Sequence, residues 1–422
     1  MSMSRRNSAL LAPFALLICF GVACGTLRAP YGAEHSARVA EATLTIPNRL
    51  SDSELWRLTS EMSEPGGYFQ SDNFTSNEES FPDIAAVLEA GMEPGGVYLG
   101  VGPEQNFSYI AALRPKMAFI VDIRRQAVMQ HLMYKALFEL SSDRAEFISR
   151  LFSKPRPKGL DTASTIDQLW EGFWYVASDS THWARNLAEV TTQLTKAHGF
   201  ALTDEDLASL EYVYRAFYEL GPIISYGGYQ VRPGAGVTFA DLTAAVDTAG
   251  TPRSFLATEK SFRYLRDMHQ RNLIVPLVGD FGGPTAIRAV AEYVKQRGAT
   301  VSAFYVSNVE QYLFRDTDTW RRFYANVHAL PLDSTSTFIR PWAGPMRVVS
   351  VVYATASGST IQVRRPMYAH SFTPMDGQPE EAGSSLCPMT AFLSAVAIGR
   401  VQTYDDVLKC PREDSRVLVV RR

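Results

Sequence analysis

The sequence is poor in the residues that most often bind metal ions in proteins. It has four cysteines and seven histidines among 422 residues. The histidines are scattered, no HExxH motif occurs, and no cysteine pair has the CxxC spacing of a zinc site. We therefore expect no metal site.

The chain also has no internal repeat, no low-complexity tract and no excess of one charge sign. Charged residues make up 20% of the chain, hydrophobic residues make up 46%, and the net charge is −3, which is an ordinary globular balance. A protein that binds nucleic acid would need a basic stripe or a high pI. We expect a small-molecule ligand and no nucleic-acid partner. The length allows two to three domain-sized units.

Long apolar runs are missing from the sequence, apart from one near its N-terminus. There, Arg5 and Arg6 precede an apolar stretch over 9–23. A positive segment followed by a short apolar one is typical of a secretory signal, and this stretch is too short to span a membrane comfortably. The sequence therefore predicts a signal peptide over 1–24, a tether over 25–50 and an exported protein, which is either periplasmic or held at the membrane by its N-terminus.

The way in which this signal ends is open. Residues 21–24 read GVAC, a loose lipobox, which predicts cleavage before Cys24 and a lipid attached to that cysteine. Cleavage near Ala33 or Ala37 without a lipid is one alternative, and an uncleaved N-terminal anchor is another.

Removal of the signal leaves few cysteines. Cys387 and Cys410 are then the only pair in the mature chain. In an exported protein such a pair favours a disulfide, which stabilises the fold by roughly 3 kcal/mol when it closes a short loop. Two buried free thiols are the alternative.

Strand and helix patterns alternate along most of the remaining chain. Residues 51–140 hold a strand–helix–strand unit, and residues 141–220 are mostly helical and rich in aromatic side chains. The alternation resumes over 221–345, and residues 346–422 form a C-terminal extension. The pattern predicts a doubly wound α/β fold with a mostly parallel sheet, whose two halves are separated by a helical insertion.

At least five short apolar segments are expected to be parallel strands. A late antiparallel strand fits the pattern as well. The clearest strand segments are VYLG at 97–100, MAFIV at 117–121, SFLA at 254–257, LIVPLV at 273–278 and VSAFYV at 301–306.

The first of these strands ends in a turn that contains glycines. In doubly wound sheets, ligands bind at the carboxyl ends of the strands, and glycine there lets a ligand approach the backbone. Gly100 and Gly102 occupy this turn, and Asp122 ends the second strand, where a carboxylate can accept from both hydroxyls of a ribose. The alternative is structural: the glycines form a tight turn and Asp122 caps the next helix.

These residues resemble motifs of a known family. VYLGVGPE at 97–104, followed by FIVD at 119–122, is similar to motifs I and II of class I S-adenosylmethionine-dependent methyltransferases. The resemblance departs at Glu104, which replaces the third glycine of the motif, and at Tyr98, where an acidic residue is usual. It implies a methyltransferase-like fold and an S-adenosylmethionine site formed by Gly100, Gly102, Glu104 and Asp122.

The carboxylate at position 104 bears on the choice of cofactor. It suits the amino group of the methionine moiety and would repel a pyrophosphate, which favours S-adenosylmethionine over NAD. Residues 95–125 and 278–314 also resemble an uncharacterised family of exported bacterial proteins. That second resemblance supports a shared fold and carries no activity.

Two later loops place polar residues at the same expected edge of the sheet. Asp280 follows a buried strand and is a candidate acid/base or substrate ligand, with a helix cap as its alternative role. Ser307 and Asn308 follow the next strand and are candidate substrate contacts. Glu310 is a second candidate base, although Ser307 and Glu310 together also fit a capping box.

A polar loop precedes the first strand. Residues 68–78 are dense in amide and hydroxyl side chains, and long polar loops often carry function. We expect Asn73, Asn77 and Glu78 to contact a substrate. A loop that is merely solvated is the alternative.

Two functions fit these observations. The first is methyl transfer from S-adenosylmethionine to an unknown acceptor, in which the protein mainly aligns the reactants and excludes water, with Asp280 or Glu310 removing a proton. The second is a non-enzymatic exported protein that binds a ligand or a partner on the same fold. The predicted signal favours the second, because S-adenosylmethionine is made in the cytoplasm.

Overall fold

The computed structural model describes residues 44–344, 349–354, 360–365 and 381–410. The predicted signal peptide over 1–24 lies outside these residues, as do most of the tether and parts of the C-terminal extension. Within the described ranges, no helix combines the length and the apolar character needed to cross a membrane.

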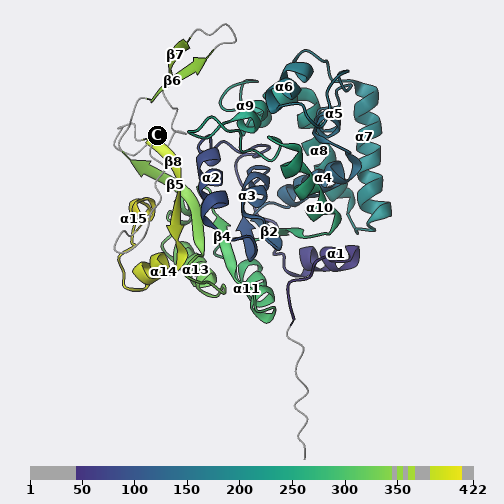
Figure 1. Cartoon of the computed structure of the whole chain (residues 1–422). Helices are drawn as coiled ribbons and strands as arrows, with labels where there is room; N and C mark the ends of the chain where they lie inside the picture. Colours follow the sequence, from purple (N-terminus) through teal and green to yellow (C-terminus); the bar gives the residue numbers. More distant parts are fainter. Residues whose placement is uncertain (1–43, 345–348, 355–359, 366–380, 411–422) are drawn as a thin grey trace, which may run out of the picture. The chain divides into compact units, whose positions relative to one another are not determined.

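Six strands form the main sheet, in the order β3-β2-β1-β4-β5-β8 (Figure 1). The first five in this order are parallel, and β8 runs antiparallel to β5. This confirms the expected α/β class with a mostly parallel sheet. The strands are β1 Val97–Gly100, β2 Met117–Asp122, β3 Ile274–Val278, β4 Val301–Tyr305, β5 Thr337–Gly344 and β8 Glu381–Pro388.

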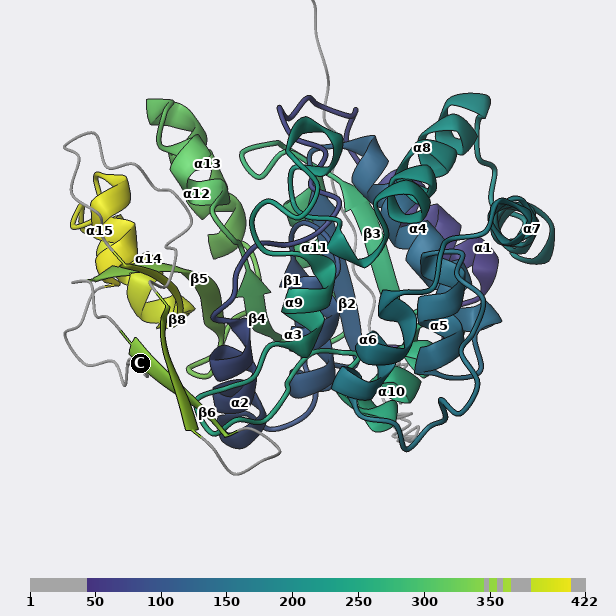
Figure 2. The ribbon, with the colours of Figure 1, turned by 90° about the horizontal axis from the view of Figure 1, so that it is seen from above.

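Helices cover both faces of this sheet (Figure 2). They include α3 Gln105–Leu113, α11 Ala286–Gln296 and α13 Thr317–His328. Along β4, the ring of Phe304 lies 6.1 Å from that of Phe323 in α13, whereas the ring of Tyr305 lies 5.0 Å from that of Tyr109 in α3. Successive residues of a strand point to opposite faces, so α3 and α13 lie on opposite sides, as in a doubly wound fold.

The strand order explains where a ligand can bind. The order β3-β2-β1-β4-β5 is the one found in common nucleotide-binding α/β sheets, and it reverses between β1 and β4. All residues of β1, β2, β3 and β4 are buried, which parallel strands covered on both faces require. The free carboxyl ends of these strands therefore open on one edge of the sheet.

The stretch 141–220 is mostly helical, with turns and loops between its helices. The helices of this region and its flanks are α4 Arg125–Leu140, α5 Arg144–Leu151, α6 Ile166–Trp174, α7 Ser180–Thr192, η1 Gln193–Ala197, α8 Asp204–Leu220, η2 Gly221–Ile223, η3 Gly228–Gln230, α9 Phe239–Ala244 and α10 Glu259–Gln270. An aromatic cluster packs helix α8 of this region against α4 and α3, which lie beside the sheet: Tyr134 of α4 contacts Phe217 of α8, and Phe107 of α3 contacts Phe138 and Phe255.

The prediction of a strand over 254–257 is wrong. This segment is a turn. Phe255 places its ring in the aromatic cluster beside Phe107, and its backbone N–H donates to Ser108 Oγ at 3.1 Å rather than to a neighbouring strand. The next strand after β2 in the chain is β3.

The remaining helices and strands come from the N-terminal and C-terminal parts of the described chain. A disulfide joins Cys387 in β8 to Cys410, which confirms the predicted pairing and ties the last described helix to the sheet. These elements are α1 Asp52–Glu61, α2 Phe81–Gly91, α12 Val309–Leu313, α14 Met389–Ala397, α15 Tyr404–Lys409 and a separate hairpin of β6 Val349–Ala354 and β7 Thr360–Arg365.

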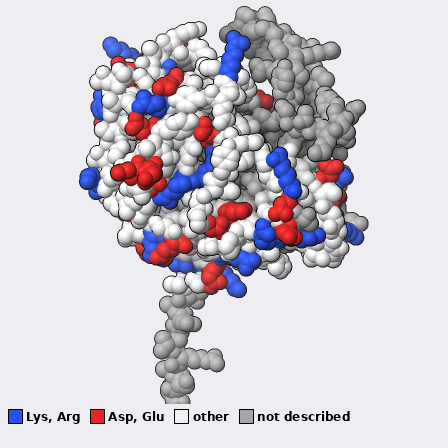
Figure 3. All heavy atoms as spheres, turned by 180° about the vertical axis from the view of Figure 1, so that it is seen from behind, with Lys and Arg blue, Asp and Glu red and all other residues white. Residues whose placement is uncertain are grey.

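Charged side chains are spread over the surface. On the face shown in Figure 3, basic and acidic residues of the described chain are interspersed. This distribution agrees with the net charge of −3 for the whole sequence.

Candidate functional site

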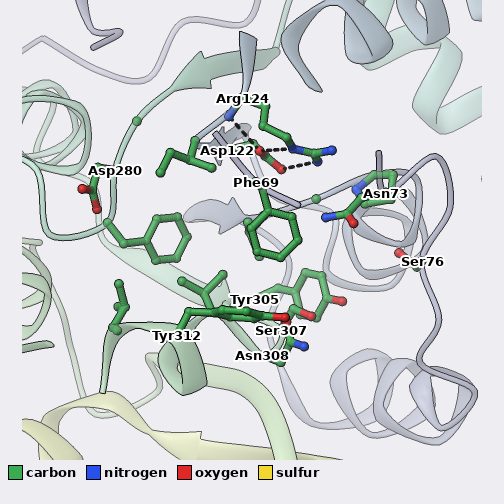
Figure 4. Close-up of a pocket in the computed structure, with 18 of the residues that line it drawn as sticks. Phe69, Asn73, Ser76, Asp122, Arg124, Asp280, Tyr305, Ser307, Asn308 and Tyr312 are labelled. Carbon is green, nitrogen blue, oxygen red and sulfur yellow. Dashed lines mark hydrogen bonds and ion pairs between the residues drawn. The ribbon is translucent and has the colours of Figure 1, made fainter. Parts of the chain in front are cut away.

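A pocket opens at the carboxyl ends of four neighbouring strands (Figure 4). It lies where the strand order reverses, which is the usual ligand site of such sheets. Its space measures about 830 Å³, including the part open to solvent. The polar and glycine residues that line it are Asn73, Ser76, Asn77, Gly102, Asp122, Arg124, Gly279, Asp280, Ser307 and Asn308.

Gly102, like Gly279, lines this pocket. Its φ is +74°, and a Cβ built on it would have no atom within 4 Å. Its carbonyl oxygen is turned away from the pocket, towards Asn106 Nδ2 at 3.1 Å and His131 Nε2 at 2.8 Å. The turn therefore needs glycine for its backbone conformation and leaves open space in front of it.

Asn106 holds the turn in place, and no motif in the sequence marks it as a site residue. Its fully buried side chain donates to the carbonyl oxygens of Val101 at 2.8 Å and Pro103 at 2.7 Å, in addition to Gly102. Its Oδ1 accepts from the Tyr98 hydroxyl at 2.9 Å. One side chain thus fixes three successive carbonyl groups.

Gly100 has a different reason to be glycine. It does not line the pocket, and a Cβ on it would lie 1.9 Å from Asn106 Oδ1 and 2.8 Å from the Tyr98 ring. The space beside Gly100 is filled by the side chains that hold the turn. No open space is left beside Gly100 for the predicted direct contact with a cofactor.

Asp122 ends β2 and reaches the pocket with its carboxylate already engaged. Arg124 donates to Asp122 Oδ1 from its backbone N–H at 3.0 Å and from Nε at 3.1 Å, and to Oδ2 from a terminal nitrogen at 3.1 Å. A carboxylate offers about four acceptor positions. One position remains, so Asp122 has room for one ribose hydroxyl rather than the two expected.

Arg124 also fixes the loop over the pocket. Its terminal nitrogen donates to the carbonyl oxygen of Ser71 at 2.9 Å and to that of Asp72. Gln130 of α4 donates to the carbonyl oxygen of Phe74 at 2.6 Å. The loop over 69–78 is therefore attached to β2 and α4, and Asp122 does not cap α4, whose N-cap is Arg124.

Glu104 is a second attachment point of this loop. Its carboxylate accepts from the Ser76 backbone N–H at 3.0 Å and is 2% exposed as a residue. Burial raises the pKa of Glu104 to about 7. Glu104 lies outside the pocket lining, so the structure places it under the loop rather than beside a ligand.

Glu78 lies behind the pocket wall formed by β4. Its Oε1 accepts from the Ser307 hydroxyl at 2.6 Å and the Tyr305 hydroxyl at 2.9 Å. Its Oε2 accepts from Ser384 at 3.2 Å and Gln105 at 3.4 Å. Burial raises the pKa of Glu78, against the lowering effect of these hydrogen bonds. It contacts the pocket through Ser307 and Tyr305 rather than directly.

The capping-box alternative for Ser307 and Glu310 is wrong. The N-cap of α12 is Asn308, which makes no side-chain capping bond, and the Ser307 hydroxyl points to Glu78 instead. Glu310 is 1% exposed, pairs with Arg340 at 3.1 Å and accepts from the Tyr324 hydroxyl at 2.6 Å. It does not line the pocket, so its predicted role as a base there has no geometric support.

Asp280 does line the pocket, and Glu64 holds the loop that contains it. Asp280 Oδ1 accepts from the Gly282 N–H at 2.9 Å, as a turn residue does. Glu64, from the segment after α1, accepts from the backbone N–H groups of Asp280 at 2.9 Å and Ala286 at 2.9 Å. Glu64 thus holds the start of α11. This role could not be predicted, because Glu64 lies far upstream in the chain.

Aromatic side chains form much of the remaining wall. Phe69 and Tyr312 meet edge to face with ring centroids 5.1 Å apart. Tyr226 comes from the segment after the helical insertion, Phe281 from the loop after β3, and Tyr305 from the end of β4. These rings are scattered through the sequence, and only the folded chain brings them together.

The predicted site residues thus fall into two groups. The pocket contains Asn73, Asn77, Gly102, Asp122, Asp280, Ser307 and Asn308. Four others lie behind or away from it, namely Gly100, Glu78, Glu104 and Glu310. Among the described residues, no group of three or more His, Cys, Asp or Glu side chains is arranged to hold a metal ion.

Comparison with known families finds a family model that matches this chain. A model described as "Domain of unknown function (DUF7790)" matches residues 73–204 and 237–364, which is more than half of the chain. The chain belongs to the DUF7790 family. The DUF7790 match includes Gly102, Asp122 and Ser307, whereas Phe69 and Tyr226 of the aromatic wall lie outside it. No curated protein matches the chain.

Proposed function

We propose that this DUF7790 protein is methyltransferase-like and binds a nucleoside-type small molecule in the pocket, with S-adenosylmethionine as the first ligand to test. The observation that carries the proposal is the position of the pocket at the ends of β1, β2, β3 and β4, across the point where the strand order reverses. The resemblance of 97–104 and 119–122 to methyltransferase motifs supports the same ligand class.

The pocket residues suit the parts of such a ligand. The open space at Gly102 admits a ligand close to the backbone, and the remaining acceptor position of Asp122 can take one ribose hydroxyl. Phe69, Tyr226 and Tyr312 offer ring faces and edges to a flat base. The acceptor of the methyl group would approach from the side of Asp280 and Asn308.

A second candidate function is binding without chemistry. It is favoured by the state of the carboxylates: Asp122 is occupied by Arg124, Glu310 is paired with Arg340, and Asp280 accepts from its own loop. These contacts make the three carboxylates less available as acid/base groups. Methyl transfer needs little acid/base chemistry, so the contacts weaken the case for catalysis without excluding it. The predicted export of the protein favours binding as well.

Calorimetric titration of the purified protein with S-adenosylmethionine and S-adenosylhomocysteine tests the proposal. We expect binding of at least one of them, and its loss in Gly102→Val, because the branched side chain fills the space in front of the turn. Gly199→Val is the control, since Gly199 also has a positive φ and open surroundings but does not line the pocket. A folded wild type that binds neither ligand contradicts the proposal.

A further inference from the structure

One contact in the pocket wall joins a nucleophile to a base. Ser307 lines the pocket, and its hydroxyl donates to Glu78 Oε1 at 2.6 Å. A serine activated by a neighbouring base that is itself held by a third group is the general arrangement for nucleophilic catalysis. We propose that Ser307 and Glu78 form a hydrolytic pair that cleaves small carboxylic esters bound in this pocket.

The backbone at Ser307 supports a role beyond packing. Its φ is +46°, in the left-handed region that costs a residue with a side chain roughly 1–2 kcal/mol. Glycine would relieve this strain but would lose the hydroxyl group and its bond to Glu78. Ser307 stands between β4 and α12, and such a strained strand-to-helix turn raises a nucleophile above the end of a sheet.

The base is held in one orientation. Tyr305 donates to the same oxygen of Glu78 as Ser307 does, while Ser384 and Gln105 donate to the other. These three groups come from β4, β8 and α3, and they prevent the carboxylate from rotating away from Ser307. Burial raises the pKa of Glu78 towards the range in which a carboxylate is an effective general base.

The reaction needs water and no other co-reactant. Ser307 Oγ attacks the ester carbonyl carbon while its proton passes to Glu78. The bond between that carbon and the alcohol oxygen then breaks, and the alcohol leaves with the proton from Glu78. Water, deprotonated by Glu78, attacks the acyl-serine, and the proton returns to Ser307 Oγ as the carboxylic acid is released.

The pocket wall indicates the substrate class. Phe69, Phe281 and Tyr312 offer apolar surface to an acyl or alcohol group, and the amide side chains of Asn73 and Asn308 offer donors to the oxyanion that forms at the carbonyl oxygen. An ester of modest size with an apolar or aromatic group fits such a wall. This activity extends the proposed function to a second reaction of the same pocket, and it does not require S-adenosylmethionine.

Labelling of the full-length protein with a fluorophosphonate probe tests the pair, with hydrolysis of p-nitrophenyl acetate and p-nitrophenyl butyrate as the second measurement. We expect the probe on Ser307, identified by peptide mass, and no label in Ser307→Ala. In Glu78→Gln, labelling and hydrolysis should slow by roughly 100-fold or more, as for loss of a general base. Ser60→Ala, at an exposed serine of α1, should behave as wild type.

Several results would overturn the inference. The inference fails if the folded wild type takes no label, if the label is on a serine other than Ser307, or if hydrolysis is unchanged in Ser307→Ala. If Glu78→Gln does not fold, the wild-type labelling rate decides: it must fall as the pH is lowered and Glu78 takes up a proton. A rate without pH dependence removes Glu78 as the base. The calorimetric result for S-adenosylmethionine bears on none of these outcomes.

Discussion

The guanidinium of Arg124 holds the carboxylate of Asp122, two residues before it, through hydrogen bonds of 3.1 Å to both oxygens. The side chains of both residues are 7% exposed. Arg124 in turn reaches the loop over the pocket at Ser71 and Asp72. A single pair therefore links the end of β2, the floor of the pocket and the loop that covers it.

Asp122→Asn should destabilise the protein as well as alter any ligand site. Asparagine keeps one acceptor but leaves the buried Arg124 cation without its partner, and breaking a buried pair costs about 3–5 kcal/mol. Urea unfolding of the protein without ligand measures this loss. Glu61→Gln is the control, because the pair of Arg57 and Glu61 is exposed and exposed pairs contribute about 0–1 kcal/mol. Equal losses in the two variants would contradict the structural role of the Asp122–Arg124 pair.

Gly100 and Gly102 should respond differently to alanine. In Gly100→Ala the new Cβ meets Asn106 Oδ1 and the Tyr98 ring, so the buried turn must shift, at about 1–3 kcal/mol or more. In Gly102→Ala the Cβ meets open space, and the loss comes from the positive φ alone, roughly 1–2 kcal/mol. Denaturant unfolding distinguishes them.

Gly199→Ala gives the matched comparison for this pair. Gly199 has a φ of +67° and no atom within 4 Å of a built Cβ, so it isolates the effect of backbone strain. We expect Gly199→Ala and Gly102→Ala to lose similar stability, and Gly100→Ala to lose more. A Gly100→Ala variant as stable as the other two would show that the contacts with Asn106 and Tyr98 relax without cost.

A histidine outside the pocket should make the stability depend on pH. His198, after η1, bonds to Asp52 at the start of α1 at 2.7 Å and to Glu139 of α4 at 2.6 Å. Burial alone would lower the pKa of His198, but its hydrogen bonds to Glu139 and Asp52 outweigh this effect and the nearby charge of Lys135, and raise it. A raised pKa means that the charged form binds its partners more strongly in the folded state.

The sign of the effect follows from this shift. The stabilisation by His198 is complete below its unfolded pKa of about 6.5 and is lost as the pH rises through the folded pKa. The free energy of unfolding of wild type should therefore exceed that of His198→Asn by roughly 1.5–3 kcal/mol near pH 6, and the difference should shrink by about pH 8.5. Urea unfolding at the two pH values measures it. A difference that grows with pH would contradict the charged state of His198.

Much of the pocket could be predicted because parallel strands end at one edge of a sheet. The segments at 97–100, 117–121, 273–278 and 301–306 are short, apolar and bounded by turn residues, so their carboxyl ends are visible in the sequence. The pocket-lining residues Gly102, Asp122, Asp280 and Ser307 each follow or close one of these segments. Local pattern and sheet geometry are enough to bring them together.

The partners of those residues could not be predicted in this way. Ser307 and Glu78 are 229 residues apart, and Asp280 and Glu64 are 216 apart. No periodic pattern marks such a contact, because it depends on how a loop outside the sheet is folded back over it. The segment 254–257 forms a turn instead of the expected strand for a related reason: Phe255 packs in a tertiary aromatic cluster, which outweighs its local preference for a strand.

The buried carboxylate of Glu104 leads to the last prediction. Burial raises the pKa of Glu104 to about 7, above the value of about 4.3 in an unfolded chain. The folded protein therefore retains a proton that the unfolded chain releases between these values, and stability falls as the pH rises through this window. Above it, the ionised carboxylate destabilises the fold by roughly 3–4 kcal/mol relative to low pH.

Glu104→Gln should remove this pH dependence. Its amide oxygen can still accept from the Ser76 N–H, and it never carries a charge into the buried site. We expect the variant to match wild type within about 1 kcal/mol near pH 5 and to be more stable above about pH 8. Thermal and urea unfolding across this range measure the difference, with Glu292→Gln, at an exposed glutamate of α11, as the control that should show no such trend. A Glu104→Gln variant less stable than wild type by the same amount at every pH would mean that Glu104 is ionised in the folded protein, and that its negative charge, rather than a neutral acceptor, holds the loop at Ser76.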